Sequence, residues 1–312
     1  MALRYVYMGT PAFAAEVLKI AVNEYGPPAL VLTQPRRPAG RGKQLLPTPV
    51  AEAATTLGLG CTECGSVNAP ETNRLLQDLR PDLFVVVAFG QILKAATLAL
   101  PRLYCLNTHA SLLPRHRGAA PIQRAILSGD SETGITIQRM VLGLDAGDIL
   151  LSKHLTITPE ETAGQLTDRL ALLAGVALVE ALKSCESGQA VFTPQDPKAV
   201  TLAPKLSKAE AAIDWTQPAG AIHNQIRGLN PWPVAETTLK GKRLLVFKSA
   251  PPSLQKINTA PGTVDTDGKN YLRFTCGDGR SLSLLEVQLE NRKRLGIAEF
   301  LKGSSLKSID RL

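Results

Sequence analysis

The amino-acid sequence predicts an α/β protein of two domains, in which a mostly parallel sheet is followed by a smaller β-rich domain. The chain has 312 residues, which is more than one domain usually holds. Over its first two thirds, short apolar runs alternate with helix-period stretches, as in sheets whose strands are joined by helices. From residue 235 onward the pattern changes to short strands separated by tight turns.

The N-terminal domain is expected to be Rossmann-like. A strand over 4–8 should lead into a helix, with Thr10 as its N-cap and Pro11 in the first helical position. The continuous apolar run 83–88 is typical of a parallel strand buried on both faces. The opening turn holds one glycine instead of the G-x-G-x-x-G cluster that seats a dinucleotide pyrophosphate, so NAD is not expected.

The remaining elements of the N-terminal domain are predicted from the periodicity of apolar residues and from the residues that begin or end helices. Further strands are expected over 29–33, 103–107, 134–139 and 149–157, and helices over 48–57, 70–79 and 119–127. Thr158-Pro-Glu-Glu161 reads as a capping box that opens a long helix ending near Gly188. An apolar stripe that includes Val176 should form the core face of that helix.

The C-terminal third predicts an OB-like β-barrel. Strands are expected over 244–247, 271–274 and 282–285, with tight turns at Lys240-Gly241, Asp267-Gly268 and Asp278-Gly279. A helix over 219–227 should place His223 on its surface or at the domain boundary, and a short helix over 297–301 closes the unit. The predicted domains are 1–189 for catalysis, 190–209 as a proline-containing linker, and 210–312 as the OB-like domain.

Composition indicates an acidic partner and a reducing compartment. The net charge is +8, and residues 208–312 hold sixteen Lys and Arg against ten Asp and Glu. Such a basic excess favours nucleic acid as a partner. The five cysteines are scattered and no transmembrane-length apolar run is present, so a cytoplasmic protein without a membrane contact is expected. Cys61-Thr-Glu-Cys64 has no second cysteine pair nearby, and we interpret both residues as structural or incidental thiols.

A long basic loop interrupts the N-terminal domain at residues 34–49. It holds Arg36, Arg37, Arg41 and Lys43, no acidic residue, four prolines and two glycines. Loops of this length in a compact domain are usually functional. We expect a mobile finger that contacts RNA phosphates, and the alternative is a solvated loop without a partner.

The candidate catalytic residues are Asn107, His109 and Asp145. Asn107 and His109 lie where a buried strand ends, at the rim where open α/β sheets bind ligands. Asp145 lies in a turn flanked by glycines, whose backbone freedom should help to aim the carboxylate. An amide and an imidazole can stabilise the oxyanion of a formyl or acyl transfer, and the carboxylate can orient the imidazole. Ordinary loop hydrogen bonds are the competing interpretation.

The whole run from Cys105 to Pro121, together with Leu144-Asp-Ala-Gly147, resembles the active-site segment of folate-dependent formyltransferases. Asn107, His109 and Asp145 match the three catalytic positions of that family. The string from His109 to Gln123 is similar to the members that act on methionyl-tRNA. The resemblance extends from Tyr7-Met-Gly-Thr-Pro11 to the final β unit.

The resemblance implies that 10-formyltetrahydrofolate donates its formyl group, as a co-substrate, to the α-amino group of methionyl initiator tRNA. No metal is implied, and we expect a monomer. The residues that the resemblance assigns to folate binding are Phe89, Gly90, Ile92, Ser111, Leu112, Leu113 and Pro114. Those assigned to tRNA binding are Arg36, Arg37, Arg41, Lys43, Lys205 and Lys208. Arg36 stands where the family commonly has Asp.

Three other functions remain open from the sequence. Formyl transfer to a small amine, such as glycinamide ribonucleotide or an amino sugar, would use the same chemistry. Hydrolysis of formyl-folate would use water in place of the amine. A non-enzymatic RNA-binding module would need none of the three catalytic side chains. The basic loop at 34–49 argues against the first two, because small acceptors and water require no such finger.

Overall fold

The computed structural model describes residues 3–39, 44–303 and 306, which fall into two compact units. The first unit comprises Met1–Pro121, Thr133–Leu155 and Thr167–Ala203. The second comprises Ile122–Glu132, Thr156–Leu166 and Pro204–Leu312. Each unit has its own sheet.

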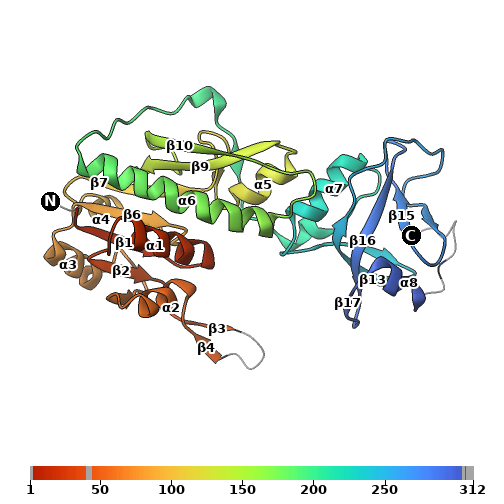
Figure 1. Ribbon diagram of the computed structural model, residues 1–312, viewed down its shortest axis with the longest axis horizontal. Helices are drawn as coiled ribbons and strands as arrows, with labels where there is room; N and C mark the ends of the chain where they lie inside the picture. Colours follow the sequence, from red (N-terminus) through yellow and green to blue (C-terminus); the bar gives the residue numbers. More distant parts are fainter. Residues whose placement is uncertain (1–2, 40–43, 304–305, 307–312) are drawn as a thin grey trace. The chain divides into compact units, whose positions relative to one another are not determined.

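The first unit is built on a seven-stranded sheet of order β10-β9-β7-β6-β1-β2-β5 (Figure 1). Its strands are β1 (Tyr5–Gly9), β2 (Leu30–Thr33), β5 (Cys61–Glu63), β6 (Leu83–Val87), β7 (Tyr104–His109), β9 (Glu132–Arg139) and β10 (Ile149–Thr156). The five strands from β5 to β7 are parallel, and β9 is antiparallel to β7. This mostly parallel sheet confirms the predicted N-terminal fold class.

Helices cover both faces of this sheet, which explains why β1 and β6 are apolar throughout. They are α1 (Ala12–Glu24), α2 (Pro49–Thr56), α3 (Pro70–Leu79), α4 (Ala95–Leu98) and α6 (Ala163–Glu186). Helix α5 (Pro121–Leu127) belongs to the second unit from Ile122 onward. On one face, Met8 and Phe84 pack in a cluster with Leu76 of α3. On the other face, the hydroxyl of Tyr7 donates to the carbonyl of Ala14 in α1, 2.6 Å away. Among the described residues, no helix is both long and apolar enough to cross a membrane.

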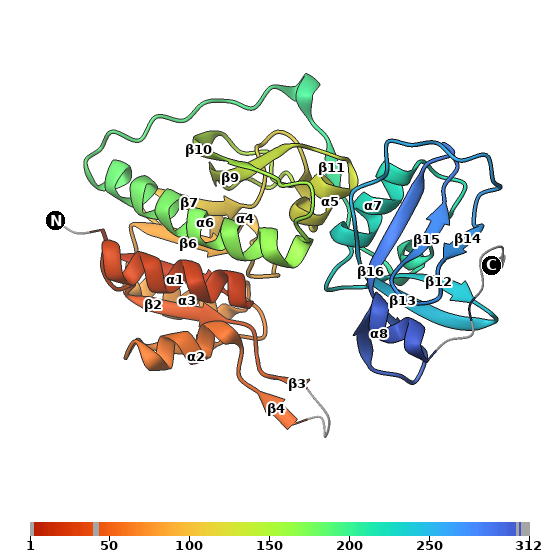
Figure 2. The same ribbon diagram turned by 45° about the vertical axis from the view of Figure 1, so that its right-hand side comes forward.

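Helices α1 and α6 lie side by side in close contact (Figure 2). A Cβ placed on Gly175 of α6 would come within 2.7 Å of the Cβ of Ile20. Ala174, Ala177 and Ala181 of α6 are also fully buried. Small side chains therefore set the distance between these two helices.

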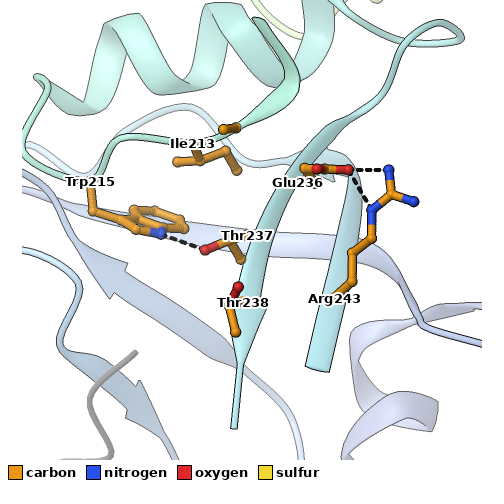
Figure 3. A pocket seen from close by; sticks show the side chains of 7 residues that line it. Ile213, Trp215, Glu236, Thr237, Thr238 and Arg243 are labelled. Carbon is orange, nitrogen blue, oxygen red and sulfur yellow. Dashed lines mark hydrogen bonds and ion pairs between the residues drawn. The ribbon is translucent and has the colours of Figure 1, made fainter. Parts of the chain in front are cut away.

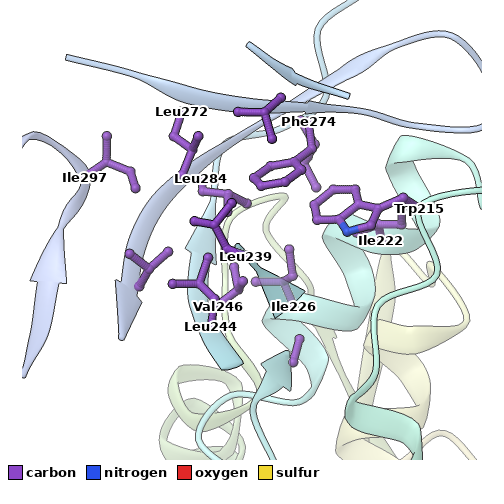
Figure 4. Packing of buried hydrophobic residues seen from close by; sticks show 14 of the residues in the cluster. Trp215, Ile222, Ile226, Leu239, Leu244, Val246, Leu272, Phe274, Leu284 and Ile297 are labelled. Atoms are coloured by element: carbon purple, nitrogen blue, oxygen red, sulfur yellow. The ribbon is translucent and has the colours of Figure 1, made fainter. Parts of the chain in front are cut away.

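The second unit is an antiparallel sheet of order β12-β13-β16-β15-β14, with β17 paired to β16. Its elements are α7 (Ala219–Gly228), β12 (Ala235–Leu239), β13 (Lys242–Ser249), β14 (Val264–Thr266), β15 (Leu272–Thr275), β16 (Ser281–Leu289), β17 (Arg294–Gly296) and α8 (Ile297–Lys302). The core, seen in Figure 4, has Trp215 stacked on Phe274 with ring centroids 4.4 Å apart. This curled antiparallel unit confirms the predicted C-terminal fold class.

Three local expectations about helices in the first part of the chain were wrong. Thr10 does not cap α1, because its hydroxyl donates instead to the carbonyl of Phe89. The Thr158–Glu161 box closes a separate turn, and α6 begins only at Ala163. Val176 is 53% exposed, because the smaller Gly175 and Ala177 face the core in its place.

His223 is buried inside the second unit, so the expected surface position was wrong. Its Nδ1 lies 2.8 Å from the hydroxyl of Ser249, and its Nε2 lies 2.9 Å from the carbonyl of Pro159. Each ring nitrogen thus has a hydrogen-bond partner at short distance. This histidine therefore has a structural role, tying the turn before α6 to the C-terminal sheet.

The basic loop contains regular structure that its prolines and glycines did not predict. β3 (Arg37–Ala39) and β4 (Gln44–Leu46) pair as an antiparallel hairpin. Short elements also occur later in the chain: β8 (Arg117–Gly118), η1 (Pro197–Ala199), β11 (Leu202–Ala203) and η2 (Lys208–Ala211). β8 and β11 pair in parallel, so part of the predicted linker is held by the first unit.

The α1–α6 contact predicts an unfavourable effect for Gly175→Ala. Alanine favours helix by about 1 kcal/mol over glycine, but the added methyl would overlap Ile20, at a cost of about 1–3 kcal/mol. We expect a lower free energy of unfolding in urea titrations. The exposed Val176→Ala is the matched control and should change it little. Adding Ile20→Ala should relieve part of the Gly175→Ala penalty, and a simple sum of the two losses would contradict this account.

Candidate active site

The candidate catalytic residues come together at the carboxyl end of β7. Alternation along a strand sends Asn107 and His109 to the same face of the sheet. On the neighbouring strand β9, Gln138 lies directly opposite Asn107. Asp145 follows β9 and reaches back to this pair, so all three residues predicted from the sequence meet at one point.

The Asp145 carboxylate accepts hydrogen bonds from three separate segments. Oδ1 accepts from Nδ2 of Asn107 at 3.3 Å and from Nε2 of Gln138 at 3.0 Å. Oδ2 accepts from the backbone N–H of Gly118 at 2.9 Å. Three donors arranged around one carboxylate leave it a single orientation.

The turn that carries Asp145, residues 143–148, is shaped differently from the expectation. Asp145 itself takes the left-handed conformation, with φ at +44°, which Asp and Asn tolerate better than most residues. Gly147 is required for close packing, because a Cβ there would lie 1.6 Å from the carbonyl oxygen of Arg139. The flanking glycine thus lets the turn lie against β9, while the aspartate supplies the unusual backbone angle.

His109 is buried and engaged on both sides of its ring. Its Nε2 lies 2.9 Å from the carbonyl oxygen of His116, which can only accept, so Nε2 carries the proton of the neutral ring. Its Nδ1 faces Oδ2 of Asp145 at 3.6 Å. The nitrogen that would gain a proton therefore points at a carboxylate.

Burial and charge act on His109 in opposite directions. Burial lowers the pKa of His109 below its ordinary value of 6.5, while the nearby Asp145 and the carbonyl of His116 raise it, and burial prevails. The neutral ring is thus favoured near pH 7. The preceding Cys105 is inert by comparison, since burial raises the pKa of its thiol to about 12 and the thiol donates to the carbonyl of Leu98.

The turn predicted for folate, Ser111 to Pro114, is held by β9. Thr136 donates to the carbonyl of Ser111 at 2.7 Å and accepts from the N–H of Leu113 at 3.1 Å. The Ser111 hydroxyl donates to the carbonyl of Arg115, and Leu113 is buried. Leu112 and Pro114 are partly exposed and follow directly after the His109 strand.

The other predicted folate segment, Phe89 to Ile92, offers backbone and one exposed side chain. Phe89 is 1% exposed and belongs to the core, so its backbone is the part that faces other groups. Its carbonyl accepts from Thr10 and from Gln34. A Cβ on Gly90 would lie 2.4 Å from Nε2 of Gln34, whereas Ile92 is 85% exposed.

The basic residues predicted for tRNA are exposed where the structure describes them. Arg36 pairs with Glu63, 2.8 Å away, and Arg37 donates to Gln34. Exposed ion pairs contribute about 0–1 kcal/mol, so the pair with Glu63 holds Arg36 only weakly. Lys205 and Lys208 are exposed in the second unit. Arg41 and Lys43 lie outside the described residues.

Sequence reasoning missed three groups at this site: Gln138, Gln195 and the N–H of Gly118. The alternation of β9 placed Gln138 on a defined face, but the register that sets it opposite Asn107 is a tertiary feature. Gln195 lies 50 residues after Asp145 and donates to its carbonyl. Gly118 has φ at +125° and packs against Ala203, where a Cβ would lie 2.7 Å from the carbonyl oxygen.

A pocket of about 340 Å³ lies elsewhere, in the second unit. Figure 3 shows Trp215 donating to Thr237 and Arg243 paired with Glu236 along its wall. None of the residues predicted for catalysis, folate or tRNA lines it. Across the part of the chain that the structure describes, no group of three or more His, Cys, Asp and Glu residues could hold a metal ion.

Comparison with known proteins identifies the class. The formyl transferase model matches residues 3–182, and the model of the formyl transferase C-terminal domain matches residues 205–305. Together these models cover most of the chain, and the chain belongs to the formyl transferase family.

Curated relatives narrow the comparison. The chain is 43% identical to the methionyl-tRNA formyltransferase of Geobacter metallireducens over 305 residues, which are 98% of this chain and 97% of that protein. It is 43% identical to that of Methylococcus capsulatus, over 97% of this chain and 98% of that protein.

Solved structures share the fold at low sequence identity. A sugar 3N-formyl transferase determined in the presence of dTDP and 5-N-formyl-THF has a TM-score of 0.69 at 17% identity, covering 94% of this chain and all of that one. HypX from Aquifex aeolicus in complex with tetrahydrofolic acid has a TM-score of 0.62 at 16% identity, covering this whole chain and 50% of that one.

The ring environment predicts how His109 titrates. By NMR of isotope-labelled histidine, we expect the neutral His109 ring to carry its proton on Nε2 and its pKa to lie below the ordinary value of 6.5. Asp145→Asn should lower the pKa further, because it removes the charge that favours the imidazolium. The His109→Gln spectrum assigns the signal. A proton on Nδ1 of the neutral ring, or titration above pH 6.5, would contradict this description.

Proposed function

We propose that this chain transfers the formyl group of 10-formyltetrahydrofolate to the α-amino group of methionyl initiator tRNA. The observation that carries the proposal is its similarity, at 43% identity over nearly its full length, to relatives named methionyl-tRNA formyltransferase. The meeting of Asn107, His109 and Asp145 at the end of β7 supplies groups suited to that chemistry.

In this mechanism the methionine amine is the nucleophile. An α-amino group titrates near pH ~8, so a useful fraction is neutral at pH 7. Its nitrogen forms a bond to the formyl carbon, the bond from that carbon to the folate nitrogen breaks, and the amine proton ends on the folate nitrogen. No covalent link to the protein is needed.

Asn107 is the stronger candidate for stabilising the oxyanion. One of its two amide hydrogens is used on Asp145, which leaves the other for the formyl oxygen. His109 is suited to carrying the proton, since Nδ1 is the basic nitrogen and the imidazolium would lie 3.6 Å from Asp145. Asp145 would offset the positive charge at the moment it forms.

Substrate binding is assigned to the segments next to this site. Ser111 to Pro114 and Phe89, Gly90 and Ile92 are proposed to hold the folate, through backbone groups wherever the side chain is buried. The proposed tRNA contacts are Arg36, Arg37, Arg41, Lys43, Lys205 and Lys208. We further propose that residues 1–189 act as the catalytic domain, 190–209 as a linker and 210–312 as the tRNA-binding domain.

An acceptor assay tests the proposed reaction. Purified protein with 10-formyltetrahydrofolate should formylate initiator methionyl-tRNA and leave elongator methionyl-tRNA, glycinamide ribonucleotide and a dTDP-amino sugar unmodified. Alanine at Asn107, His109 or Asp145 should lower kcat by roughly 10²- to 10⁴-fold with tRNA binding kept. His154→Ala, an exposed histidine on β10, is the control and should retain activity. Transfer to a small amine, or formate release in buffer, would overturn the assignment.

The basic residues predict a salt-dependent contribution to tRNA use. Lys205→Ala and Lys208→Ala should each raise the KM for tRNA and reduce its dependence on salt concentration, by about one unit of log–log slope for each phosphate that the protein no longer neutralises. The KM for folate should stay constant. Lys19→Ala, an exposed lysine paired with Glu16 on α1, is the matched control. If the KM for tRNA and its salt dependence were the same in all three variants, Lys205 and Lys208 would not contact the tRNA.

A further inference from the structure

Residues 193–203, here called the strap, link the two segments that build the active site. The chain leaves α6 and returns alongside β10 (Figure 2), where Thr193 and Ile149 exchange backbone hydrogen bonds of 2.8 and 2.9 Å. Farther on, Leu202 and Ala203 of β11 pair with Arg117 and Gly118 of β8. The strap thus contacts the Asp145 turn first and the segment after His109 second.

At its first contact, the side chain of Gln195 enters the Asp145 turn. Its Nε2 donates to the carbonyl of Asp145 at 2.9 Å and to the carbonyl of Gly147 at 2.7 Å. These bonds fix the backbone on both sides of Ala146. They act on the residue whose φ of +44° is intrinsically disfavoured.

Arg117 fixes which way the Gln195 amide points. Its Nε and Nη2 donate to Oε1 of Gln195 at 3.0 and 2.7 Å. Because a guanidinium can only donate, Oε1 must face Arg117 and Nε2 must face the turn. Gln138 extends this hydrogen-bond chain. Its Oε1 accepts from Nε2 of Gln195 at 3.4 Å, and its own Nε2 donates to the carboxylate of Asp145.

At its second contact, the strap positions the groups that hold the ring and the carboxylate. The Thr201 hydroxyl accepts from the N–H of His116, whose carbonyl accepts from His109. The β8–β11 pairing places Gly118, whose N–H donates to Oδ2 of Asp145.

We propose that Gln195, oriented by Arg117, is a positioning residue that holds the Asp145 turn so that its carboxylate faces Asn107 and His109. Gln195 touches no reacting atom and acts through Asp145. This proposal rests on the function proposed above and assigns to the predicted linker a part in catalysis. The hydrogen bonds of Gln195 converge on Asp145, which is the one aspartate with a left-handed backbone conformation among the described residues. Stability alone would not require the bonds to be placed there.

The decisive variant is Gln195→Glu. The carboxylate keeps the shape of the side chain and its partner Arg117, but it loses the N–H groups that Asp145 and Gly147 accept. We expect kcat for formyl transfer to fall by roughly ten- to a hundredfold, as for a small misplacement of a catalytic group, with the KM for folate and tRNA unchanged. Gln195→Ala should behave alike. Gln189→Ala, an exposed glutamine in the turn after α6, is the matched control and should keep full kcat.

Coupling to Asp145 separates positioning from general stability. In single-turnover assays with enzyme in excess, Gln195→Glu should lower the rate in the wild-type background and have no further effect beside Asp145→Ala. Thermal unfolding of each variant is measured in parallel. Full kcat in Gln195→Glu, or an undiminished loss in the Asp145→Ala background, would overturn the proposal. A wild-type protein that formylates no methionyl-tRNA would instead refute the proposed function.

Discussion

The candidate active site depends on the hydrogen bonds that one carboxylate, that of Asp145, accepts. Its donors come from β7, β8 and β9, and the donors Asn107 and Gly118 lie 38 and 27 residues away in the sequence. A left-handed backbone at a residue with a Cβ costs about 1–2 kcal/mol. The bonds to its side chain, and those from Gln195 to its backbone, stabilise the turn in spite of that cost. Because Asp145 is held in this way, its Oδ2 faces Nδ1 of His109 and helps to orient the ring.

The parallel sheet fixes the positions of the side chains in this arrangement. β6 and β7 are packed between helices on both faces, and strand alternation alone sets the direction of Asn107 and His109. Groups carried by buried strands are held more rigidly than groups carried by loops. The two loops that must contribute, the Asp145 turn and the segment after His109, are bound to the sheet by Gly147 and Thr136 and to each other by the strap. These contacts restrict the movement of both loops.

Recognition of a large acidic substrate places different demands on the chain. Long-range attraction to phosphates requires exposed cations but little geometric accuracy. The proposed tRNA contacts Arg36, Arg37, Lys205 and Lys208 have this character, because all four are exposed. The C-terminal unit keeps its own core around Trp215 and Phe274, so charged residues on its surface can vary without affecting that packing. Chemistry and recognition therefore rest on different physical features of the same protein.

The sequence by itself determined most of the elements and the family to which the chain belongs, because both leave local signals. Apolar runs and helix periodicity predicted every strand of the seven-stranded sheet except β5, and every helix of the first unit except the short α4. The run around Asn107 and His109 carried the family resemblance. Tertiary structure decided what depends on register and distant contact. The pairing of Gln138 with Asn107, the burial of His223 and the exposure of Val176 follow from how elements pack. Gln195 has no local pattern, and only the path of the strap brings it to Asp145.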